Sequence, residues 1–582
     1  MAQSRETVDR AWWKESSVYQ IYPASFKDSN GDGLGDIPGI TSKLDYIKSL
    51  GIDILWTCPI FASPQVDYGY DISNYKDIYP PYGTLADVDE LIKGCHDRGL
   101  KILMDLVVNH TSDQHVWFQE SKKSKSNEYR DFYIWRKPKY NANGERQPPN
   151  NWAAAWGGSA WKYDETTDEY YLHLFAPEQP DLNWENPKVR NAVHDIIHFW
   201  LKRGADGFRM DVINFISKVP ELPDAEVVYP HTPWQPGQKY FACGPRLHEY
   251  LNEIGIILKE YNAFSVGEMP FVEDPRDIIK AVASDRDELK MIFHFEIVDM
   301  DLGDLGKFYP RQWKMSKFKS IVNKWQNFMI DNKGWNANYL ENHDQSRSVS
   351  RWGSDALEHR VVCAKMFATF LALQSGTVFV YQGQEIGMIN IPKERDISEY
   401  RDIETLNAWN ESGCSMMRDH PDDIELHRIT KEEIQKKSRD NARTPMQWDT
   451  SKYAGFSTTT PWQRENESYL TINAASQVGV KDSVFEHWAA LLRLRKKYVD
   501  VLIYGNFEMV DNENGDIFAY SRKFENQKVL IVANFRPREI SWKIPDGLDL
   551  QKEKILIANY EISLNSKTLN LRPFEAFACF VK

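Results

Sequence analysis

The stretch Gly207-Phe-Arg-Met-Asp-Val212 has the character of a short buried strand that ends in polar chemistry. Its three apolar side chains alternate with Arg209 and Asp211, and a period of two is typical of a β-strand. Side chains two residues apart on a strand point to the same side, so this guanidinium and this carboxylate are expected to meet. An opposite charge within about 4–6 Å favours an ionised carboxyl group. We therefore expect Arg209 to hold Asp211 ionised, as a nucleophile requires, although an Arg–Asp pair that only stabilises a strand end would have the same pattern.

Length and composition indicate a globular enzyme of two or three domains. The chain has 582 residues, of which 42% are hydrophobic and 27% charged. The net charge of −13 is spread along the chain without a basic run, which argues against a nucleic-acid or anionic-membrane partner. Aromatic residues make up 13% of the chain, and sugar rings have apolar faces that stack on aromatics. A small carbohydrate ligand is therefore compatible with the composition.

Three features predict a cytoplasmic protein. The first ten residues have no apolar core and do not resemble a signal peptide. The six cysteines are scattered without a CxxC pair, which is typical of free thiols in a reducing compartment. The most apolar window, Val361 to Tyr381, is long enough to span a membrane, but it contains Lys365 and Gln374. We interpret it as a buried helix followed by a strand.

The first two-thirds of the chain alternates short apolar strands with amphipathic stretches, which predicts an α/β fold with a parallel sheet. Eight such strands match a (β/α)8 TIM barrel, whose active site lies at the C-terminal ends of the strands. The expected strands are Val18–Ser25, Ile54–Pro59, Ile102–Val108, Gly207–Val212, Phe264–Met269, Ile292–Ile297, Asn338–His343 and Thr377–Tyr381.

Two connections are too long for simple βα loops and predict additions to the barrel. The barrel is expected to comprise residues 1–110 and 187–501, with an inserted domain after the third strand at residues 111–186. Residues 385–439 are charged and partly helical, and we expect them to form a subdomain at the rim of the barrel. Alternating strands and turns in residues 502–582 predict a C-terminal antiparallel β-sandwich.

Polar side chains follow four of the predicted strands at the points where these strands end. Carboxylates and histidines from different strands therefore converge on one rim of the predicted barrel. The segments are Asp105-Leu-Val-Val-Asn-His110, Arg209-Met-Asp211, Gly267-Glu268 and Glu341-Asn-His-Asp344.

Three of these acids, Asp211, Glu268 and Asp344, suit a reaction in which positive charge develops on the substrate, as in glycoside hydrolysis. One carboxylate would attack the anomeric carbon while a protonated carboxyl group supplies a proton to the leaving oxygen. On neighbouring strands Asp211 and Glu268 can lie about 5–5.5 Å apart, which is the retaining geometry. Repulsion from ionised Asp211 and Asp344 is expected to raise the pKa of Glu268.

These four segments resemble the four sequence blocks of the α-amylase family, glycoside hydrolase family 13. Gln179-Pro-Asp-Leu-Asn183 resembles the fifth block of its oligo-1,6-glucosidase and α-glucosidase branch. The similarity runs from Trp12 through Trp448 and is collinear over nearly the whole chain, with fungal isomaltase and maltase enzymes the nearest in pattern.

The resemblance implies roles for individual residues. Asp211 corresponds to the nucleophile, Glu268 to the acid/base and Asp344 to the stabiliser of the transition state, which also binds the 2- and 3-hydroxyls of the glucose. Asp67 and Arg439 match the pair that holds the non-reducing 4-hydroxyl, so that the enzyme acts on terminal glucose. The remaining substrate-binding positions are Tyr70 and Phe175 as aromatic walls, with His110, Arg209 and His343 around the ring.

Two positions bear on linkage specificity. Val212 matches the residue of branch members that cleave α-1,6 bonds, whereas maltose-preferring members tend to carry Thr. The two side chains differ by a methyl against a hydroxyl group, which is worth about 1–3 kcal/mol of discrimination at most. Ala155 stands where fungal relatives usually have a bulky aromatic residue, which would widen the mouth of the pocket. Isomaltose-type activity is favoured.

Several alternatives remain open. A maltase- or sucrase-type α-1,4-glucosidase, a glucosyl transferase or a sucrose isomerase would use the same glucosyl-Asp211 intermediate. A transporter heavy chain shares the barrel without glycosidase function, but it requires a transmembrane helix and lacks the full set of carboxylates. We expect a monomer that acts on a small oligosaccharide, with no organic cofactor.

The loop from Asp28 to Asp36 predicts a structural metal. It has oxygen ligands at the spacing of an EF-hand, but Gly39 stands where an EF-hand requires a bidentate Glu. The loop instead resembles the structural Ca²⁺ or Mg²⁺ loop of the family. The implied ligands are Asp28, Asn30, Asp32, Asp36 and the carbonyl oxygen of Leu34.

Overall fold

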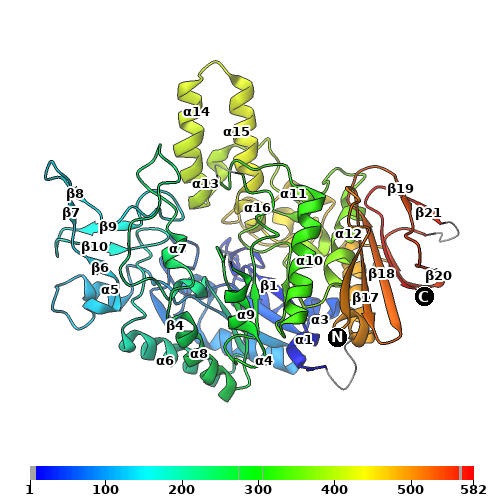
Figure 1. Cartoon of the computed structure of the whole chain (residues 1–582), viewed down its shortest axis with the longest axis horizontal. Coiled ribbons are helices and arrows are strands. Elements are labelled where there is room, and N and C mark those ends of the chain that lie inside the picture. Colours follow the sequence, from blue (N-terminus) through cyan, green and yellow to red (C-terminus); the bar gives the residue numbers. More distant parts are fainter. Residues whose placement is uncertain (1–7, 273, 304–305, 563–566, 582) are drawn as a thin grey trace.

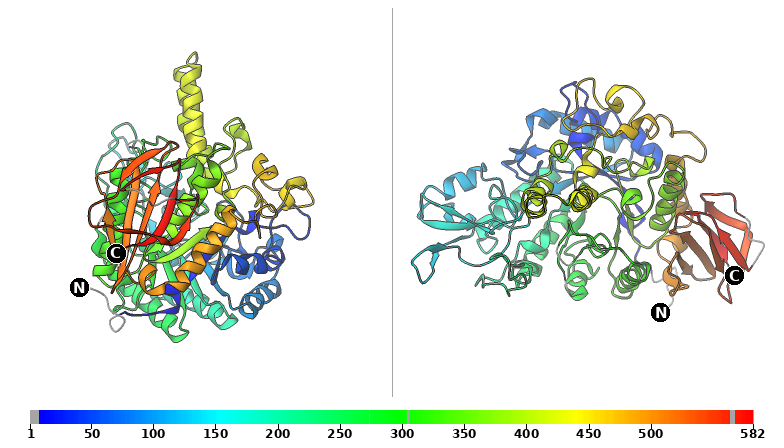
Figure 2. Two further views of the ribbon diagram at one scale, coloured as in Figure 1. Left: turned by 90° about the vertical axis from the view of Figure 1, so that its right-hand side faces the viewer. Right: turned by 90° about the horizontal axis from the view of Figure 1, so that it is seen from above.

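The computed structural model describes residues 8–272, 274–303, 306–562 and 567–581. A central barrel carries a small β-rich domain at one end and an antiparallel β-domain at the other (Figure 1). A helical hairpin stands out from the barrel between them, and it is seen end-on in the right-hand view of Figure 2.

The barrel has eight strands in the order β13-β12-β11-β5-β2-β1-β15-β14, and all neighbours are parallel. A further parallel bridge between Ile292 and Asn336 joins its two ends. The predicted TIM barrel is confirmed. Its strands are β1 (Ser17–Ile21), β2 (Ile54–Thr57), β5 (Lys101–Leu106), β11 (Gly207–Met210), β12 (Phe264–Glu268), β13 (Met291–Phe293), β14 (Ala337–Asn338) and β15 (Thr377–Tyr381).

Strand β11 begins at a glycine because the barrel is tight there. A Cβ atom on Gly207 would lie 1.9 Å from the carbonyl oxygen of Phe264 on β12. The next three residues are fully buried or nearly so. Residues 207–210 thus form the fourth barrel strand along the chain, and Asp211 and Val212 directly follow it.

Several strands end earlier than predicted. Pro23–Ser25 form a 3-10 turn rather than the end of β1, because Pro23 has no N–H group to donate to the sheet. Strand β14 spans only Ala337–Asn338, and the chain then leaves the sheet. There the backbone N–H of Asp344 donates to the side chain of Asn342, which forms a local turn. Polar residues after these strands therefore lie on loops at the barrel rim.

The helices pack outside the barrel and have ordinary start and stop signals. A capping box of Thr84 and Asp87 begins α4, while Asn186 caps α6 and Gly204 ends it in the left-handed conformation. Among the described residues, no helix combines the length and apolarity needed to cross a membrane. The main helices are α2 (Ile37–Thr41), α3 (Leu44–Leu50), α4 (Leu85–Asp97), α6 (Pro187–Arg203), α7 (Gln238–Phe241), α8 (Leu247–Glu260), α9 (Pro275–Val282), α10 (Met315–Asp331), α11 (Ser348–Trp352), α12 (Arg360–Ala372), α16 (Asp440–Arg443), α17 (Val484–Lys497) and α18 (Val499–Leu502).

The apolar window Val361–Tyr381 forms helix α12 and strand β15, as predicted. From Cys363 onwards every residue of α12 is buried, because it lies between the barrel and the C-terminal domain. The helix contacts α17 on one side and strands β18 (Gln527–Asn534) and β22 (Ala576–Val581) on the other.

The long connection after β5 contains its own small sheet. Its strands are β6 (Trp135–Arg136), β9 (Trp161–Asp164) and β10 (Glu169–Leu172), with the helix α5 (Val116–Ser121) and the hairpin β7 (Lys139–Tyr140) and β8 (Arg146–Gln147). Its apolar cluster includes Val212 and Phe215, which follow β11, so this segment packs over the barrel mouth.

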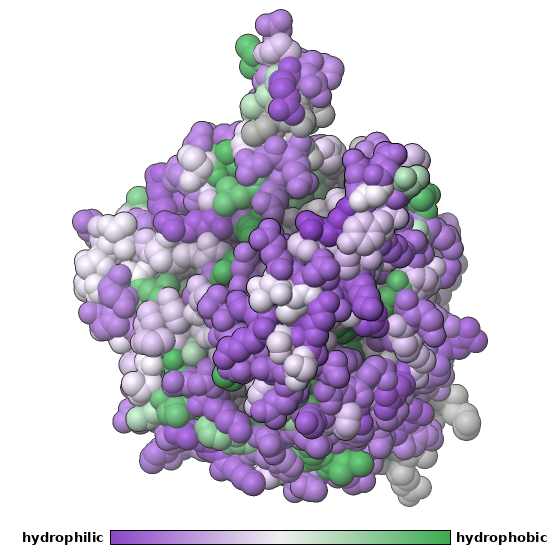
Figure 3. Space-filling model, turned by 90° about the vertical axis from the view of Figure 1, so that its left-hand side faces the viewer, coloured by the Kyte–Doolittle hydropathy of each residue, from purple (hydrophilic) through white to green (hydrophobic). Residues whose placement is uncertain are grey.

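The rim subdomain supplies the projecting hairpin. It contains α13 (Ile403–Ala408), α14 (Cys414–Asp419) and α15 (Ile424–Lys437), of which α14 and α15 form the tip. Viewed from the side of the β-rich domain, the hairpin stands clear of a largely hydrophilic surface with scattered hydrophobic patches (Figure 3).

The C-terminal segment is the predicted antiparallel β-domain. Its five-stranded sheet has the order β16-β17-β18-β22-β20, with β16 (Asn506–Val510), β17 (Ile517–Phe524) and β20 (Leu550–Ala558), and a second sheet pairs β19 (Ile540–Lys543) with β21 (Thr568–Leu571). Apolar side chains from both sheets form one cluster, as in a sandwich.

Candidate active site

Arg209 binds three carboxylates at the C-terminal end of the barrel. Its Nη1 atom lies 2.9 Å from Oδ1 of Asp105 and 2.8 Å from Oδ1 of Asp211, and Nη2 lies 2.7 Å from Oε2 of Glu268. Strand β11 pairs with β5 on one side and with β12 on the other, so three adjacent strands deliver these groups. The predicted meeting of Arg209 and Asp211 is confirmed, and Glu268 shares the same guanidinium.

One guanidinium cannot neutralise three ionised acids in a buried site. Burial raises the pKa of Asp211 to about 7 and that of Glu268 to about 8, and Arg209 opposes both shifts. Arg209 favours the ionised form of Asp211, as expected, but burial outweighs it, so the expectation that Arg209 holds Asp211 ionised is wrong near neutral pH. The predicted rise for Glu268 is confirmed, with burial as its main cause and repulsion as a lesser one. The raised pKa of Glu268 is in the direction that a proton donor at neutral pH needs.

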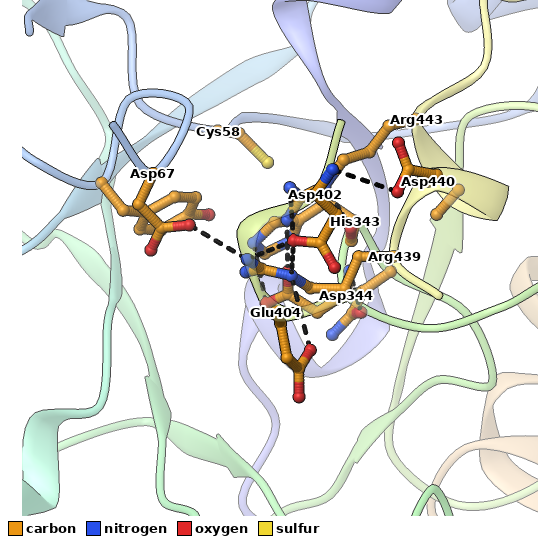
Figure 4. Close-up of polar contacts among 12 residues, drawn as sticks. Cys58, Asp67, His343, Asp344, Asp402, Glu404, Arg439, Asp440 and Arg443 are labelled. Carbon is orange, nitrogen blue, oxygen red and sulfur yellow. Dashed lines mark hydrogen bonds and ion pairs between the residues drawn. The ribbon is translucent and has the colours of Figure 1, made fainter. Parts of the chain in front are cut away.

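Asp344 faces two arginines and a histidine (Figure 4). Its Oδ1 atom lies 2.7 Å from Nη2 of Arg443 and 3.3 Å from Nη1 of Arg439, and its Oδ2 atom lies 3.1 Å from Nε2 of His343. Although burial opposes ionisation, these partners hold the pKa of Asp344 well below its usual range. Asp344 is therefore a fixed negative charge at neutral pH.

His343 is neutral and held in one orientation. Burial lowers its pKa to about 3. The side-chain amide of Gln20 donates to Nδ1 at 2.9 Å, so the proton of the imidazole resides on Nε2, which faces Asp344. The ring of Tyr70 stacks on His343 with 5.0 Å between centroids and 7° between planes.

Arg439 closes one end of the site by joining three parts of the chain (Figure 4). Its Nη2 atom lies 3.1 Å from Oδ1 of Asp67 and 2.6 Å from Oδ1 of Asp402, which belongs to the rim subdomain. The ring of Trp156, from the inserted segment, covers its guanidinium at 4.3 Å. Gln179 donates to the other oxygen of Asp67 at 3.2 Å. The pairing of Asp67 with Arg439 places an ionic wall beside Asp344.

The predicted aromatic and histidine positions line the same region but differ in exposure. Tyr70 is 5% exposed and donates from its hydroxyl group to Asp105 at 3.2 Å, so it belongs largely to the packed floor. His110 is buried and neutral, since burial lowers its pKa to about 4, and its Nε2 atom lies 3.1 Å from the backbone oxygen of Tyr70. Phe175 is only partly buried and contacts the rings of His110 and Trp156 at 5.0 and 5.6 Å.

Val212 occupies a strained position directly after the proposed nucleophile. Its φ is 34° and its ψ is 44°, a left-handed conformation that is rare for a β-branched residue. Its backbone N–H donates to Oε2 of Glu268 at 3.4 Å, while its side chain packs in the apolar cluster of the inserted segment. The strain is thus located between the two proposed catalytic acids.

In the loop from Asp28 to Asp36, the carboxylates of Asp28 and Asp36 accept hydrogen bonds from nearby backbone N–H groups. The carboxylate of Asp28 accepts from the N–H groups of Asn30, Gly31 and Gly33, and Asp36 caps α2 through Gly39. In the part of the chain that the structure describes, no three His, Cys, Asp or Glu side chains are placed together to hold a metal ion. The metal at Asp28, Asn30, Asp32, Leu34 and Asp36 stays a prediction.

Sequence reasoning omitted Asp105, Asp402 and Arg443 from the site. Asp105 begins the segment Asp105–His110 and lies on the strand next to that of Arg209. This position could have indicated that the two side chains meet. Arg443 follows Arg439 by four residues, and this spacing places both side chains on one face of a helical turn. Asp402 had no such signal, because it comes from a connection of irregular structure.

Comparison with known proteins agrees with this geometry. Residues 20–505 match the family described as alpha amylase, catalytic domain, and residues 517–577 match the alpha-amylase SusG C-terminal domain. The chain is 48% identical to an alpha-glucosidase of Schizosaccharomyces pombe, with 98% of each chain covered, and 48% identical to an oligo-1,6-glucosidase of Parageobacillus thermoglucosidasius, with 98% of this chain and 99% of the other covered. It is also similar to the crystal structure of isomaltulose synthase from Erwinia rhapontici, with a TM-score of 0.90, 37% identity and 99% and 100% coverage. The chain therefore belongs to the α-amylase family of glycoside hydrolases, family 13.

Proposed function

We propose that this protein is a retaining α-glucosidase that releases terminal α-glucose from short oligosaccharides. The observation that carries the proposal is the pair of acids on one guanidinium, Asp211 and Glu268, together with the raised pKa of Glu268, which suits a proton donor. A nucleophile and an acid held side by side are consistent with the spacing of about 5–5.5 Å that a retaining mechanism needs.

In the first step a carboxylate oxygen of Asp211 bonds to the anomeric carbon as the glycosidic bond breaks. The proton of Glu268 passes to the leaving oxygen, so the leaving group departs neutral. In the second step a water molecule gives a proton to Glu268 while its oxygen bonds to the same carbon and displaces Asp211. Two inversions return the α configuration.

Asp344 is proposed to bind the glucose hydroxyls and to stabilise the positive charge that develops on the ring. Its fixed ionisation supports this role. We propose the neutral Nε2–H of His343 and the guanidinium of Arg439 as hydroxyl donors, and the Asp67–Arg439 pair as the closed end that faces the non-reducing terminus; their positions beside Asp344 support this. A closed end restricts the enzyme to terminal units.

We propose a preference for α-1,6 bonds, as in isomaltose, which rests on Val212. The similarity to an enzyme named oligo-1,6-glucosidase supports it. A second candidate is transfer of the glucosyl group to a sugar rather than to water, and the similarity to an isomaltulose synthase favours that reading. Hydrolysis of maltose or sucrose is the further alternative.

The metal, the cellular setting and the oligomeric state are proposals as well. We propose a structural Ca²⁺ or Mg²⁺ on the Asp28–Asp36 loop, supported by its oxygen-rich spacing, and a monomer. A cytoplasmic setting is supported by cysteines that form no disulfide, namely Cys58, Cys95, Cys243, Cys363 and Cys579.

The test is glucose release from isomaltose, maltose and sucrose in parallel, followed by proton NMR within the first minutes. We expect α-glucose to appear first and isomaltose to be cleaved fastest. If β-glucose appears first, the retaining mechanism is refuted, whereas rapid maltose cleavage refutes only the linkage preference. Isomeric disaccharides formed from sucrose would identify the transfer reaction.

A further inference from the structure

Phe271 is an exposed aromatic residue close to the proposed acid. It stands three residues after Glu268, and 55% of its side chain is exposed. Its φ of 58° lies in the left-handed region, which is unfavourable for a bulky side chain. Strained residues that persist near an active site are often maintained for function.

The surrounding chain fixes this conformation. The side-chain amide of Asn214 donates to the carbonyl oxygen of Pro270 at 2.8 Å, and the N–H of Met269 donates to the backbone oxygen of Phe293 at 3.3 Å. These bonds anchor the two residues before Phe271 to the loop after β11 and to β13. The exposed ring is therefore presented by a supported backbone.

The ring of Phe271 continues a row of aromatic side chains that begins in the active site. Phe271 stacks on Phe215 with 6.1 Å between centroids and 8° between planes, and Phe215 stacks on Phe175 at 6.3 Å and 23°. Phe175 in turn contacts His110. The row therefore links Phe271 to Phe175, the predicted aromatic wall of the glucose pocket.

A cavity of about 320 Å³ lies next to Phe271, which is one of its lining residues. Phe271 and Phe295 supply apolar surface to it, and Glu296 and Asp299 supply carboxylates. Lys317 and Trp325 of α10 also line it. Aromatic faces combined with hydroxyl acceptors suit a neutral sugar ring better than an anion.

We propose that Phe271 is a stacking platform for the ring that follows the cleaved bond, with this cavity as the space for a sugar or aryl leaving group. The proposal rests on the proposed glucosidase function, because it assigns the product side of that same site. One face of the ring is covered by Phe215, and its exposed remainder is available to the apolar face of a pyranose.

The experiment compares leaving groups with and without a ring. For Phe271→Ala, we expect kcat/KM for isomaltose and for p-nitrophenyl α-glucoside to fall about three- to tenfold, the worth of one stacking contact. The same constant for α-glucosyl fluoride is expected to change less than about twofold, because fluoride makes no stacking contact. Phe271→Trp should retain the activity on both ring-bearing substrates.

Two controls separate the proposal from a structural role. Tyr140→Ala removes another aromatic side chain, 61% exposed in the inserted segment, and should leave all substrates unchanged. Phe271→Gly relieves the backbone strain, so its Tm should not fall although its kcat/KM for isomaltose does. An equal loss on all three substrates, or no loss on isomaltose, overturns the proposal. If the wild type does not hydrolyse α-glucosyl fluoride, the glucosidase function itself has failed.

Discussion

Replacing Asp105 with Asn should move the acid limb of the pH profile to lower pH. Asp105 and Asp211 accept from the same nitrogen of Arg209, at 2.9 and 2.8 Å, so their oxygens lie roughly 5 Å apart. Two unit charges at that distance repel by about 3 kcal/mol at an effective dielectric constant of about 20, which corresponds to roughly two pKa units. Asn keeps the shape and can still accept from Tyr70 and Trp56.

The sign follows from which form of each acid is active. In the proposed mechanism the nucleophile Asp211 must be ionised, so activity should fall below its pKa of about 7. The proposed acid Glu268 must be protonated, so activity should fall above its pKa of about 8. Removing the charge of Asp105 lowers the pKa of Asp211, because it removes a repulsion and because Arg209 then has one fewer carboxylate to neutralise. The acid limb should therefore move down by about one to two pH units, and the bell should broaden.

The assay is kcat/KM for isomaltose across the pH range, with the melting temperature recorded at each pH. Asp45→Asn is the matched control, because it breaks an exposed Arg–Asp pair with Arg98 far from the site and should leave both limbs in place. The alkaline limb should shift less than the acid limb, since the charges that act most on Glu268 are those of Arg209, Asp211 and Asp344. An acid limb that stays in place or moves upward refutes the shared-guanidinium account.

Three further predictions concern single features. Asp211→Ala should reduce turnover of isomaltose by at least about 10⁴-fold while circular dichroism and Tm stay close to the wild type, and near-normal activity would remove Asp211 as the nucleophile. Val212→Thr should shift the ratio of kcat/KM for isomaltose over maltose towards maltose by roughly 10-fold, and because both side chains are β-branched the backbone strain is unchanged; an unaltered ratio contradicts the role of Val212. Adding EDTA should lower Tm without changing the isomaltose-to-maltose ratio, and a constant Tm would count against a metal on the Asp28–Asp36 loop.

The order of elements could be predicted from the sequence because buried parallel strands form apolar runs of recognisable length. All eight barrel strands were placed, and the register of Arg209 with Asp211 followed from the period of two. The strand ends were less predictable. The departure of the chain after Asn338 depends on a local turn at Asn342, which apolar periodicity does not report.

Protonation in the site could not be predicted from pairs of residues. The sequence indicated that Arg209 would contact Asp211, but not that Asp105 and Glu268 would also form ion pairs with Arg209. Nor could it indicate the depth of burial, which is the largest influence on both proposed catalytic acids. Asp402 was missed for a related reason, since its contact with Arg439 joins segments that no short motif connects.

The closed end at Arg439 has a consequence for the order of events in each turnover. Asp67 and Asp402 bind this arginine and Trp156 lies over it, so in the proposed orientation of the substrate glucose has one route in and out, on the side away from Arg439. The leaving group occupies that route, so it must depart before the glucosyl group can be released. The molecule that attacks next arrives along the same route, where sugars compete with water. The fraction of transfer products should therefore rise with substrate concentration, and a long chain must dissociate after every glucose it loses.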